Sequence, residues 1–544
     1  MKPWDIIFVL PYPFTDHPSF PEGTLKRALE KTGFGVGVIE TPFWQDPASF
    51  TVLGRPRRFF SIIPGPVDSM VLNYTALGKR RKEDRYQRTG QSFFKDTPKS
   101  VKYKIRPDRT VIVFANRIRE AYQDVPIVIG GLEASSRCFA HYDFHQNRIR
   151  RSILLDTRAD FLVAGMGEKQ IVKIAQRIKN GIGPDEIIPG TARVVRSQPS
   201  IEEYSVLPDS EDVKNTPDKL LESQLIMEKA RMEGRGLTQK CGGRWVVQAP
   251  PEIYTTKDLD EIYESPFTRN HLNQGPVSPA LQMNSFSITT HRGCGGGCSF
   301  CVIHTHEGRG VISRSMDSIQ KEIKNLIGHP SWKGYLSDLG GASAEMYGND
   351  CHNIISCKRP SCLYPKRCRT FRPGRAYLDL LRHCRKIDGV KKNFLGSGIR
   401  FDIALENPIL LEEIMRFHSG RYLRVAPEHT EDHVLQLMRK PGFEKFEAFV
   451  DLFNDINKKL SRKIDVAPYI ILGHPGETLE DVRAMKKKLR SLNLKIKDVQ
   501  IFTPTPGTLS TAMYWAEKNP SMGHLPVEKD PKRLETRKRL LLEL

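Results

Sequence analysis

The sequence predicts an α/β protein in two parts, an open parallel sheet followed by a barrel of strand–helix units. Two observations carry this prediction. Residues 1–196 alternate short apolar segments with helical ones, and a second alternation begins near residue 281 with three cysteines in a glycine-rich loop. Alternating strands and helices are typical of parallel sheets. Residues 1–196 are therefore expected to form a Rossmann-like domain and residues 281–515 the barrel.

The strands of the first domain are short apolar runs that end in turn residues. Between the first two, Leu25, Ala28 and Leu29 have helical spacing, and Gly33 follows as a stop signal. Ile171 and Ile174 indicate another helix after the last strand. The strands are expected within residues 5–10, 34–39, 59–63, 124–131 and 160–168.

Two glycine-containing loops follow strands of this domain, Gly130–Ser135 and Gly165–Glu168. Ligands of open α/β sheets bind beyond the carboxyl ends of the strands, so these loops could cradle a ligand. Their glycines could equally make tight turns from strand to helix. The residues alone leave both interpretations open.

The segments between the strands carry weaker signals. The basic stretch Lys79–Arg85 is expected to be a solvated loop, and Arg148–Arg151 the surface face of a helix, although either could contact an anionic partner. Residues 197–280 include one expected helix at 218–235 and several prolines. They are expected to connect the two domains and to pack across both.

Composition bounds the class of protein. The 544 residues are 39% hydrophobic and 27% charged, which is the balance of a globular chain of two to four domains. No apolar run approaches the roughly 20 residues that span a bilayer, and the first apolar run is interrupted by Asp5. We expect a cytoplasmic protein without a membrane segment. The net charge of +21 favours an anionic partner such as nucleic acid, with RNA possible, or anionic substrates; the alternative is that it serves general solubility.

In the second half, successive segments end in polar groups, as barrel strands with an active site do at their carboxyl ends. Strands are expected within 285–290, 334–341, 422–429, 469–478 and 499–507, with helices from Ser313 and at 482–492. Residues 348–370 form a Cys-rich insertion, and residues 516–544 a helical tail. The sequence stops without a cap in its basic, leucine-rich helix, 534–544.

Three cysteines, Cys294, Cys298 and Cys301, have C-x3-C-x2-C spacing, with Phe300 just before the third. Thiolates are soft ligands suited to zinc or iron–sulfur clusters, and a cubane cluster normally takes four of them. Three cysteines can hold three irons and leave the fourth iron open to a small molecule. Ordinary loop thiols are the alternative.

This loop resembles the signature of the radical S-adenosylmethionine (radical SAM) superfamily. The resemblance implies that the three cysteines ligate a [4Fe–4S] cluster whose open iron binds S-adenosylmethionine (SAM), and that the second half is a partial (β/α)6 radical SAM barrel. It implies further contacts to SAM from the residues at the strand ends. These cofactor-binding residues are Phe300, Gly340, Gly341, Ser397 and Arg400.

The flanking motifs are similar to the YgiQ family of radical SAM proteins. They include Gly130–Ser135, Glu307–Arg309, Ser337–Gly341 and Ala426–His429. The N-terminal domain is similar to the cobalamin-binding domain that precedes many radical SAM barrels. Cobalamin is nevertheless not expected, because Asp16 and His17 are adjacent and the Asp-x-His-x-x-Gly motif is not present.

A second cysteine group lies in the insertion, among lysines and arginines that favour thiolates. Four thiolates could form a closed zinc site or an auxiliary iron–sulfur cluster, or remain free structural thiols. The spacing lacks the C-x2-C pairs of a zinc ribbon. The four residues are Cys351, Cys357, Cys362 and Cys368.

The function hypothesis is therefore a radical SAM enzyme that cleaves SAM reductively, forms a 5′-deoxyadenosyl radical and acts on an unidentified substrate. It would receive electrons from a donor of the flavodoxin or ferredoxin type. The alternative is an iron–sulfur module that binds RNA or protein and in which SAM chemistry is vestigial.

Overall fold

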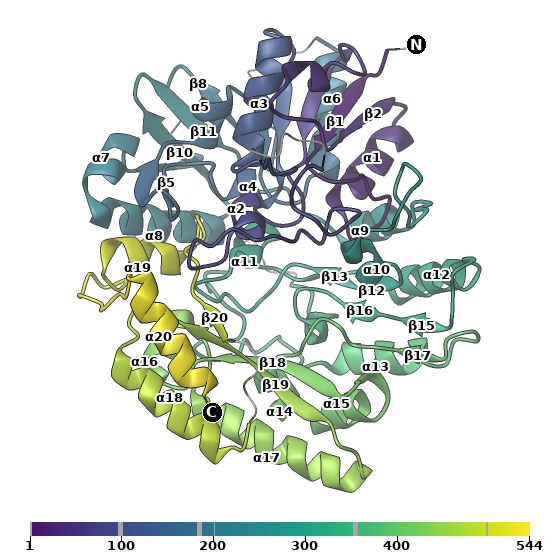
Figure 1. Ribbon diagram of the computed structural model, residues 1–544, viewed down its shortest axis with the longest axis vertical. Helices are drawn as coiled ribbons and strands as arrows, with labels where there is room; N and C mark the ends of the chain where they lie inside the picture. The colour runs from purple at the N-terminus through teal and green to yellow at the C-terminus, as the bar shows by residue number, and fades with distance from the viewer. Residues whose placement is uncertain are drawn as a thin grey trace. The chain divides into compact units, whose positions relative to one another are not determined.

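The protein is described by a computed structural model (Figure 1). It describes residues 3–95, 102–181, 188–200, 202–351, 357–494, 496 and 499–543. The chain divides into two compact units. Unit 1 contains Met1–Ile253 and Ser265–Ser285, with the short piece that includes Cys357 and Lys358. Unit 2 contains the rest of the described chain, from Tyr254–Glu264 and from Phe286 onward.

Unit 1 is built on a nine-stranded sheet in the order β2-β1-β3-β4-β7-β8-β11-β10-β9. The first five strands in this order are parallel and confirm the strands expected from the sequence. The strands are β1 (Ile6–Leu10), β2 (Val36–Glu40), β3 (Phe59–Ile62), β4 (Ile127–Ile129), β7 (Phe161–Val163), β8 (Thr191–Val195), β9 (Tyr204–Leu207), β10 (Gly236–Cys241) and β11 (Arg244–Gln248).

Helices cover both faces of this sheet, because successive side chains of a strand point to opposite faces. Along β1, Ile7 and Val9 pack with apolar residues of α3 (Thr110–Ala121). Ile6, Phe8 and Leu10 pack on the opposite face with α1 (Pro21–Lys31) and α6 (Glu168–Lys179). The two faces therefore have separate cores, as a doubly wound sheet requires.

The expectation of a connecting segment at 197–280 is wrong for its first half. β9, β10 and β11 extend the sheet of unit 1, and α8 (Pro217–Glu233) matches the expected helix. β10 escaped prediction because it buries polar residues. Gln239 accepts from the Ala140 amide at 2.8 Å and donates to the Pro208 carbonyl at 3.0 Å, so hydrogen bonds replace apolar periodicity.

The run Arg148–Arg151 is also not a helix face. Residues Arg148–Arg150 form β6, which pairs antiparallel with β5 (His141–Asp143). Arg150 and Arg151 both pair with Asp156, at 2.7 Å each. Two of the three arginines of this run therefore already form ion pairs within unit 1.

The adjacent pair Asp16 and His17 ties the segment Ser265–Ser285 to the sheet. The Asp16 carboxylate accepts from the Thr268 amide at 2.9 Å and pairs with Arg27. His17 is fully buried; its Nδ1 accepts from the Ser19 amide at 3.0 Å, and its Nε2 lies 2.8 Å from Arg269. Both ring nitrogens therefore have protein partners.

Unit 2 is a partial barrel of parallel strands, as expected. β12 pairs with β16, β15 with β17, and β18, β19 and β20 form one sheet, while a parallel bridge from Ile399 to Val425 joins the chain after β17 to β18. The strands are β12 (Ser287–Thr289), β15 (Tyr335–Leu336), β16 (Asp338–Gly340), β17 (Lys392–Asn393), β18 (Tyr422–Glu428), β19 (Asp465–Leu472) and β20 (Val499–Ile501).

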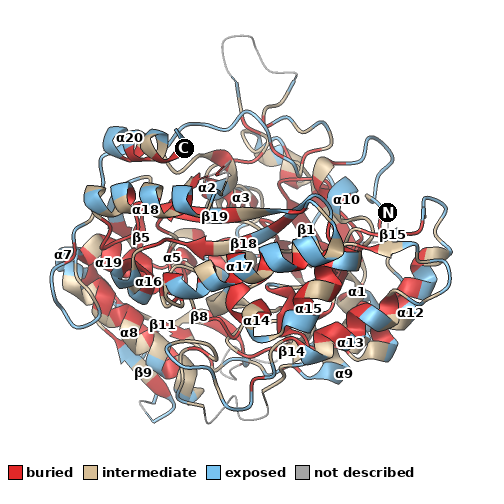
Figure 2. Cartoon of the chain, turned by 90° about the horizontal axis from the view of Figure 1, so that it is seen from below, coloured by how far each residue is buried: buried red, intermediate tan, exposed pale blue. Residues whose placement is uncertain are grey.

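Amphipathic helices follow these strands and bury one side each, as Figure 2 shows for α17. Phe446, Phe449 and Phe453 of α17 are buried. In the tail, α20 packs on α18 and β20. Across the described residues, no helix has both the length and the apolar character needed to cross a membrane. The main helices are α12 (Met316–Ile327), α13 (Arg375–Cys384), α14 (Phe401–Glu406), α16 (Asp432–Met438), α17 (Phe443–Leu460), α18 (Leu479–Ser491), α19 (Leu509–Ala516) and α20 (Pro531–Leu542).

Candidate functional site

The cysteine loop of unit 2 begins after the short strand β13 (His291–Arg292) and ends at helix α11 (Val302–His306). Two of its glycines have backbone angles that other residues rarely adopt, with φ +82° at Gly293 and +64° at Gly297. A Cβ at either position would also collide with a carbonyl oxygen, that of Gly310 or of Pro360. The glycine-rich sequence is thus required by the path of the loop.

The thiols of this loop lie close to one another in a protected place. The Gly296 amide donates to Cys294 Sγ at 3.4 Å. Burial, together with the neighbouring thiols, raises the pKa of Cys294 to about 11 and that of Cys301 to about 12. At neutral pH these thiols are protonated in the metal-free chain. A metal must displace their protons, which metal binding to thiols does.

Arg400 lies beside the cysteine loop. Its Nη1 is 3.9 Å from Cys298 Sγ, and its guanidinium forms a two-pronged pair with Asp402 at 2.9 and 3.0 Å. The sequence singled out Arg400 but not Asp402. A two-pronged pair fixes the plane of a guanidinium, so Asp402 orients Arg400 toward the loop.

Ser397 and Gly340, expected together at one site, are in contact. A Cβ at Gly340 would collide with Ser397 Oγ. Ser397 Oγ donates to Asp338 Oδ1 at 3.1 Å, and the same oxygen accepts from the Gly396 amide at 2.8 Å. Gly341 lies against the buried ring of His291. The structure therefore gathers the expected strand-end residues and adds Asp338.

Two more acidic groups are buried in unit 2: Glu345, which the sequence did not mark, and Glu428, which lies in the Ala426–His429 motif. Glu345 accepts from the Arg400 amide and, at 3.1 Å, from Ser343 Oγ; burial raises its pKa to about 7. Glu428, at φ +63°, pairs with Lys440 at 2.7 Å. A carboxyl with a raised pKa next to an arginine is typical of functional sites.

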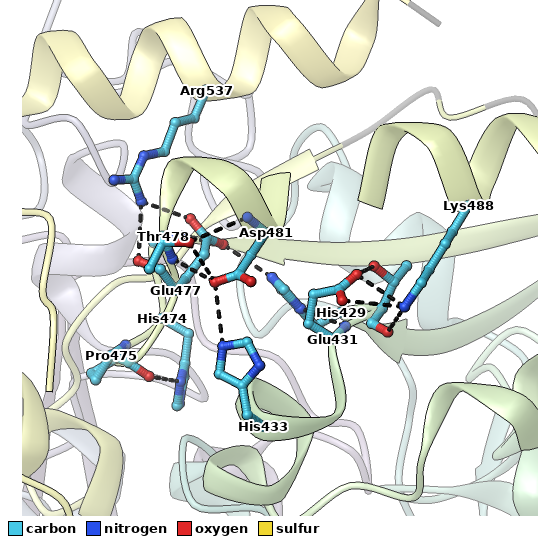
Figure 3. A network of polar contacts seen from close by, with 12 residues as sticks. His429, Glu431, His433, His474, Pro475, Glu477, Thr478, Asp481, Lys488 and Arg537 are labelled. Atoms are coloured by element: carbon cyan, nitrogen blue, oxygen red, sulfur yellow. Dashed lines mark hydrogen bonds and ion pairs between the residues drawn. The ribbon is translucent and has the colours of Figure 1, made fainter. Parts of the chain in front are cut away.

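The turn after β19 is held by the polar network in Figure 3. Glu477 accepts from the Gly473 amide at 3.0 Å and lies 3.3 Å from His429 Nε2. Arg537 of α20 pairs with the other oxygen of Glu477 at 2.9 Å. Glu477, fully buried, thus fixes the glycine turn that follows the strand.

The Cys-rich insertion contacts the cysteine loop directly, which the spacing did not reveal. The Cys362 amide donates to the Gly295 carbonyl at 2.7 Å, and Ser361 Oγ donates to the Gly296 carbonyl at 2.7 Å. Cys362 and Cys294 pack against the same small apolar cluster.

Within the described part of the chain, which includes all ten cysteines, no three His, Cys, Asp or Glu side chains are arranged to hold a metal ion. This applies to the three cysteines of the loop as well as to those of the insertion. The second metal site, Cys351, Cys357, Cys362 and Cys368, stays a prediction.

Comparisons with known proteins agree with this architecture. Residues 1–287 match the family model "Radical SAM N-terminal", and residues 288–489 match "Radical SAM superfamily". The solved structure of a radical SAM methyltransferase, TsrM from Kitasatospora setae with cobalamin and a [4Fe-4S] cluster bound, has a TM-score of 0.51 at 16% identity. The match covers 93% of this chain and 76% of TsrM, and at this identity it shows a shared fold.

Full-length relatives are much more similar. A UPF0313 protein of Methanocella arvoryzae is 41% identical over 95% of this chain and 86% of its own length. One from Geobacter sulfurreducens is 40% identical over 99% of this chain and 89% of its own length. With this identity along both units, the chain belongs to UPF0313, the YgiQ family of the radical SAM superfamily.

Proposed function

We propose that the chain is a radical SAM enzyme in which Cys294, Cys298 and Cys301 hold a [4Fe–4S] cluster. The observation that carries the proposal is the cysteine loop itself: three neighbouring thiols on a backbone that only glycines permit, with an amide hydrogen bond to one sulfur. Hydrogen bonds to sulfur are a usual feature of iron–sulfur sites. When bound, the cluster supplies the electron that cleaves SAM to a 5′-deoxyadenosyl radical, which takes hydrogen from a substrate.

The chain's own residues would bind and orient SAM around this loop. Arg400, fixed by Asp402, offers positive charge beside Cys298, which suits a carboxylate. Ser397, Gly340 and Gly341 lie at the neighbouring strand ends, where Gly341 leaves room for the buried ring of His291. Phe300 contributes an aromatic surface next to the third cysteine. We leave the substrate open.

The proposed test is anaerobic reconstitution of the full chain, followed by dithionite and SAM. We expect about four irons per chain for one cluster and formation of 5′-deoxyadenosine. The Cys298→Ala variant should lose both the bound iron and the formation of 5′-deoxyadenosine. The control Cys241→Ala, which changes a cysteine of unit 1, should retain both. A chain that binds iron but does not respond to SAM would favour the alternative, an iron–sulfur module for RNA or protein binding.

If the insertion cysteines bind a metal, the metal content per chain will exceed that of one cluster. An auxiliary cluster predicts about eight irons per chain, and a zinc site predicts zinc, with either lost in Cys357→Ala. If the metal content of Cys357→Ala equals that of the wild type, these residues are structural thiols. We also propose an electron donor of the flavodoxin or ferredoxin type, which reduction of the cluster by the purified donor would test.

A further inference from the structure

Ser299, the residue after Cys298, is anchored through its backbone and its hydroxyl. It is 3% exposed. Its amide donates to the Met438 carbonyl at 3.1 Å, and its carbonyl accepts from the Ser510 amide at 3.0 Å. Its Oγ lies 2.7 Å from the Leu437 carbonyl and 2.8 Å from Ser510 Oγ. The cysteine loop is therefore held between the end of α16 and the first turn of α19.

Ser510 extends this anchor to a buried histidine. Ser510 Oγ lies 2.7 Å from His474 Nε2, and His474 is 1% exposed. The histidine follows β19, and its ring packs edge-on against Phe300, with the ring centres 6.5 Å apart, and against Phe502 at 5.3 Å. His474, after the end of β19, therefore contacts the cysteine loop in two ways, indirectly through Ser510 and directly through the ring of Phe300.

The number of available hydrogens determines which group donates and which accepts in each of these hydrogen bonds. The Leu437 carbonyl can only accept, so the Ser299 hydroxyl donates to it. The Pro475 carbonyl, 2.9 Å from His474 Nδ1, can also only accept, so His474 donates from Nδ1. Burial lowers the pKa of His474 to about 3, so the ring is neutral and has one N–H.

The Nδ1–H tautomer determines the remaining contacts. Figure 3 shows the contact of His474 Nδ1 with the Pro475 carbonyl. His474 Nε2 therefore carries a lone pair and accepts from the Ser510 hydroxyl. Ser510 Oγ in turn accepts from the Ser299 hydroxyl, whose hydrogen is shared with the Leu437 carbonyl.

We propose that Ser510 and His474 are positioning residues of the cysteine loop, which fix Ser299 and through it the spacing of Cys298 and Cys301. Their role is to hold the chain between these two thiols in one conformation, with or without metal. The inference rests on the proposed function only for what the loop would bind. The order of the loop itself can be measured in the metal-free chain.

The first test is hydrogen exchange of the metal-free, full-length chain. Ser510→Ala removes the hydroxyl and keeps the helix, since alanine favours helices. We expect the amides of residues 299–301 to exchange about tenfold faster, because one or two net hydrogen bonds are lost. The matched control is Ser491→Ala at the exposed end of α18, where the hydroxyl donates to the Lys488 carbonyl of the same helix. Unchanged exchange in Ser510→Ala would overturn the inference.

The second test separates the hydrogen bond of His474 Nε2 from the packing of its ring. Glutamine places a polar amide group near the position of Nε2, whereas phenylalanine keeps only the aromatic packing. We expect His474→Gln to preserve slow exchange of residues 299–301 and His474→Phe to lose it. Equal behaviour of the two variants would contradict the assigned hydrogen-bond chain, even if Ser510→Ala proves unstable.

A third readout uses the reconstituted protein. Ser510→Ala should release iron to a chelator several-fold faster than the wild type, with a broadened electron paramagnetic resonance signal of the reduced cluster. If the wild type binds no iron, the proposed function fails while the exchange experiment still decides the role of Ser510. If the wild type binds iron and Ser510→Ala matches it in every readout, the positioning role fails and the proposed function stands.

Discussion

Glu345 is a buried carboxyl whose titration can be measured directly. Its folded pKa of about 7 lies above the unfolded value, because burial penalises the charged form. Between about pH 4.5 and 7 the folded state holds a proton that the unfolded state has released, so this group's contribution to stability decreases as pH rises. The full change is about 3 kcal/mol.

We therefore predict that Glu345→Gln, which cannot ionise, gains stability relative to the wild type on going from pH 5 to pH 7.5. Denaturant unfolding at the two pH values gives the difference. Glu480→Gln, on the exposed face of α18, serves as the control and should show no such trend. A constant difference between Glu345→Gln and the wild type would contradict the raised pKa.

Glu133 belongs to a motif that the sequence offered as a ligand cradle. In unit 1 its carboxylate accepts from the Ser69 amide and from the Val111 amide, at 3.0 Å each. These amides lie in the first turns of α2 (Ser69–Asn73) and α3. Burial, together with the nearby Asp68, raises the pKa of the Glu133 carboxyl. The side chain of Glu133 thus connects the starts of two helices of unit 1.

From this arrangement we predict that Glu133→Gln destabilises unit 1 by about 2 kcal/mol, because an amide nitrogen would face a backbone donor. The unfolding free energy measures the effect. Glu120→Gln, an exposed surface pair with Arg117, should change it by less than about 0.5 kcal/mol. If both variants are equally stable, Glu133 is not the anchor of these helices.

At the scale of elements, the sequence predicted those with regular apolar patterns. β1, β3 and β18 were expected because their apolar residues are contiguous or alternate. β10 was missed because Thr238 and Gln239 are buried polar residues. The cysteine loop was predictable from spacing, but its partners Asp402, Ser361 and Ser510 were not, because they come from distant segments that only the fold brings together.

Whether unit 1 can bind a large ligand depends on the loops after β1 and β3. β1 lies between β2 and β3, and ligands of such sheets bind outside this reversal of strand order. Tyr12 follows β1 and donates to Glu22 at 2.7 Å, and the buried Arg106 lies 5.3 Å from the Tyr12 ring. Gln87 donates to the Pro11 carbonyl at 2.7 Å. The chain's own side chains fill this position.

We accordingly predict that the purified chain does not bind hydroxocobalamin, although the structural neighbour TsrM has cobalamin bound. Equilibrium dialysis at micromolar cobalamin, followed by absorption spectroscopy, is the measurement. Arg106→Met, which keeps most of the side-chain volume, is a control for nonspecific opening of the site. Stoichiometric binding by the wild type would show that the segment around Arg106 moves aside.

At the scale of the whole molecule, the chain has 84 lysines and arginines against 63 acidic residues. Some of these basic residues form buried ion pairs, and others are exposed. Many arginines pair within the fold, as Arg106 does with Asp84. The packed helices α18 and α20 carry exposed basic residues in unit 2. They are Arg483, Lys487, Arg490, Lys532, Arg533 and Arg539, of which Arg483, Arg533 and Arg539 also pair with acidic residues close by in the sequence.

RNA is the anionic partner that we propose for this surface, and its signature is salt dependence. Binding that neutralises six or more phosphates should weaken by about a hundredfold or more between 50 and 200 mM salt. Fluorescence anisotropy with a labelled single-stranded RNA measures this.

Replacing Lys487, Lys532 and Arg539 by Glu should reduce both the affinity and the salt slope. The same reversal at three exposed lysines of unit 1 should have a smaller effect, because it changes the net charge equally but leaves α18 and α20 intact. These are Lys214, Lys229 and Lys240. A response that is flat with salt, or equal for the two triple variants, would remove RNA binding at α18 and α20 and leave the positive charge as a general property of the surface.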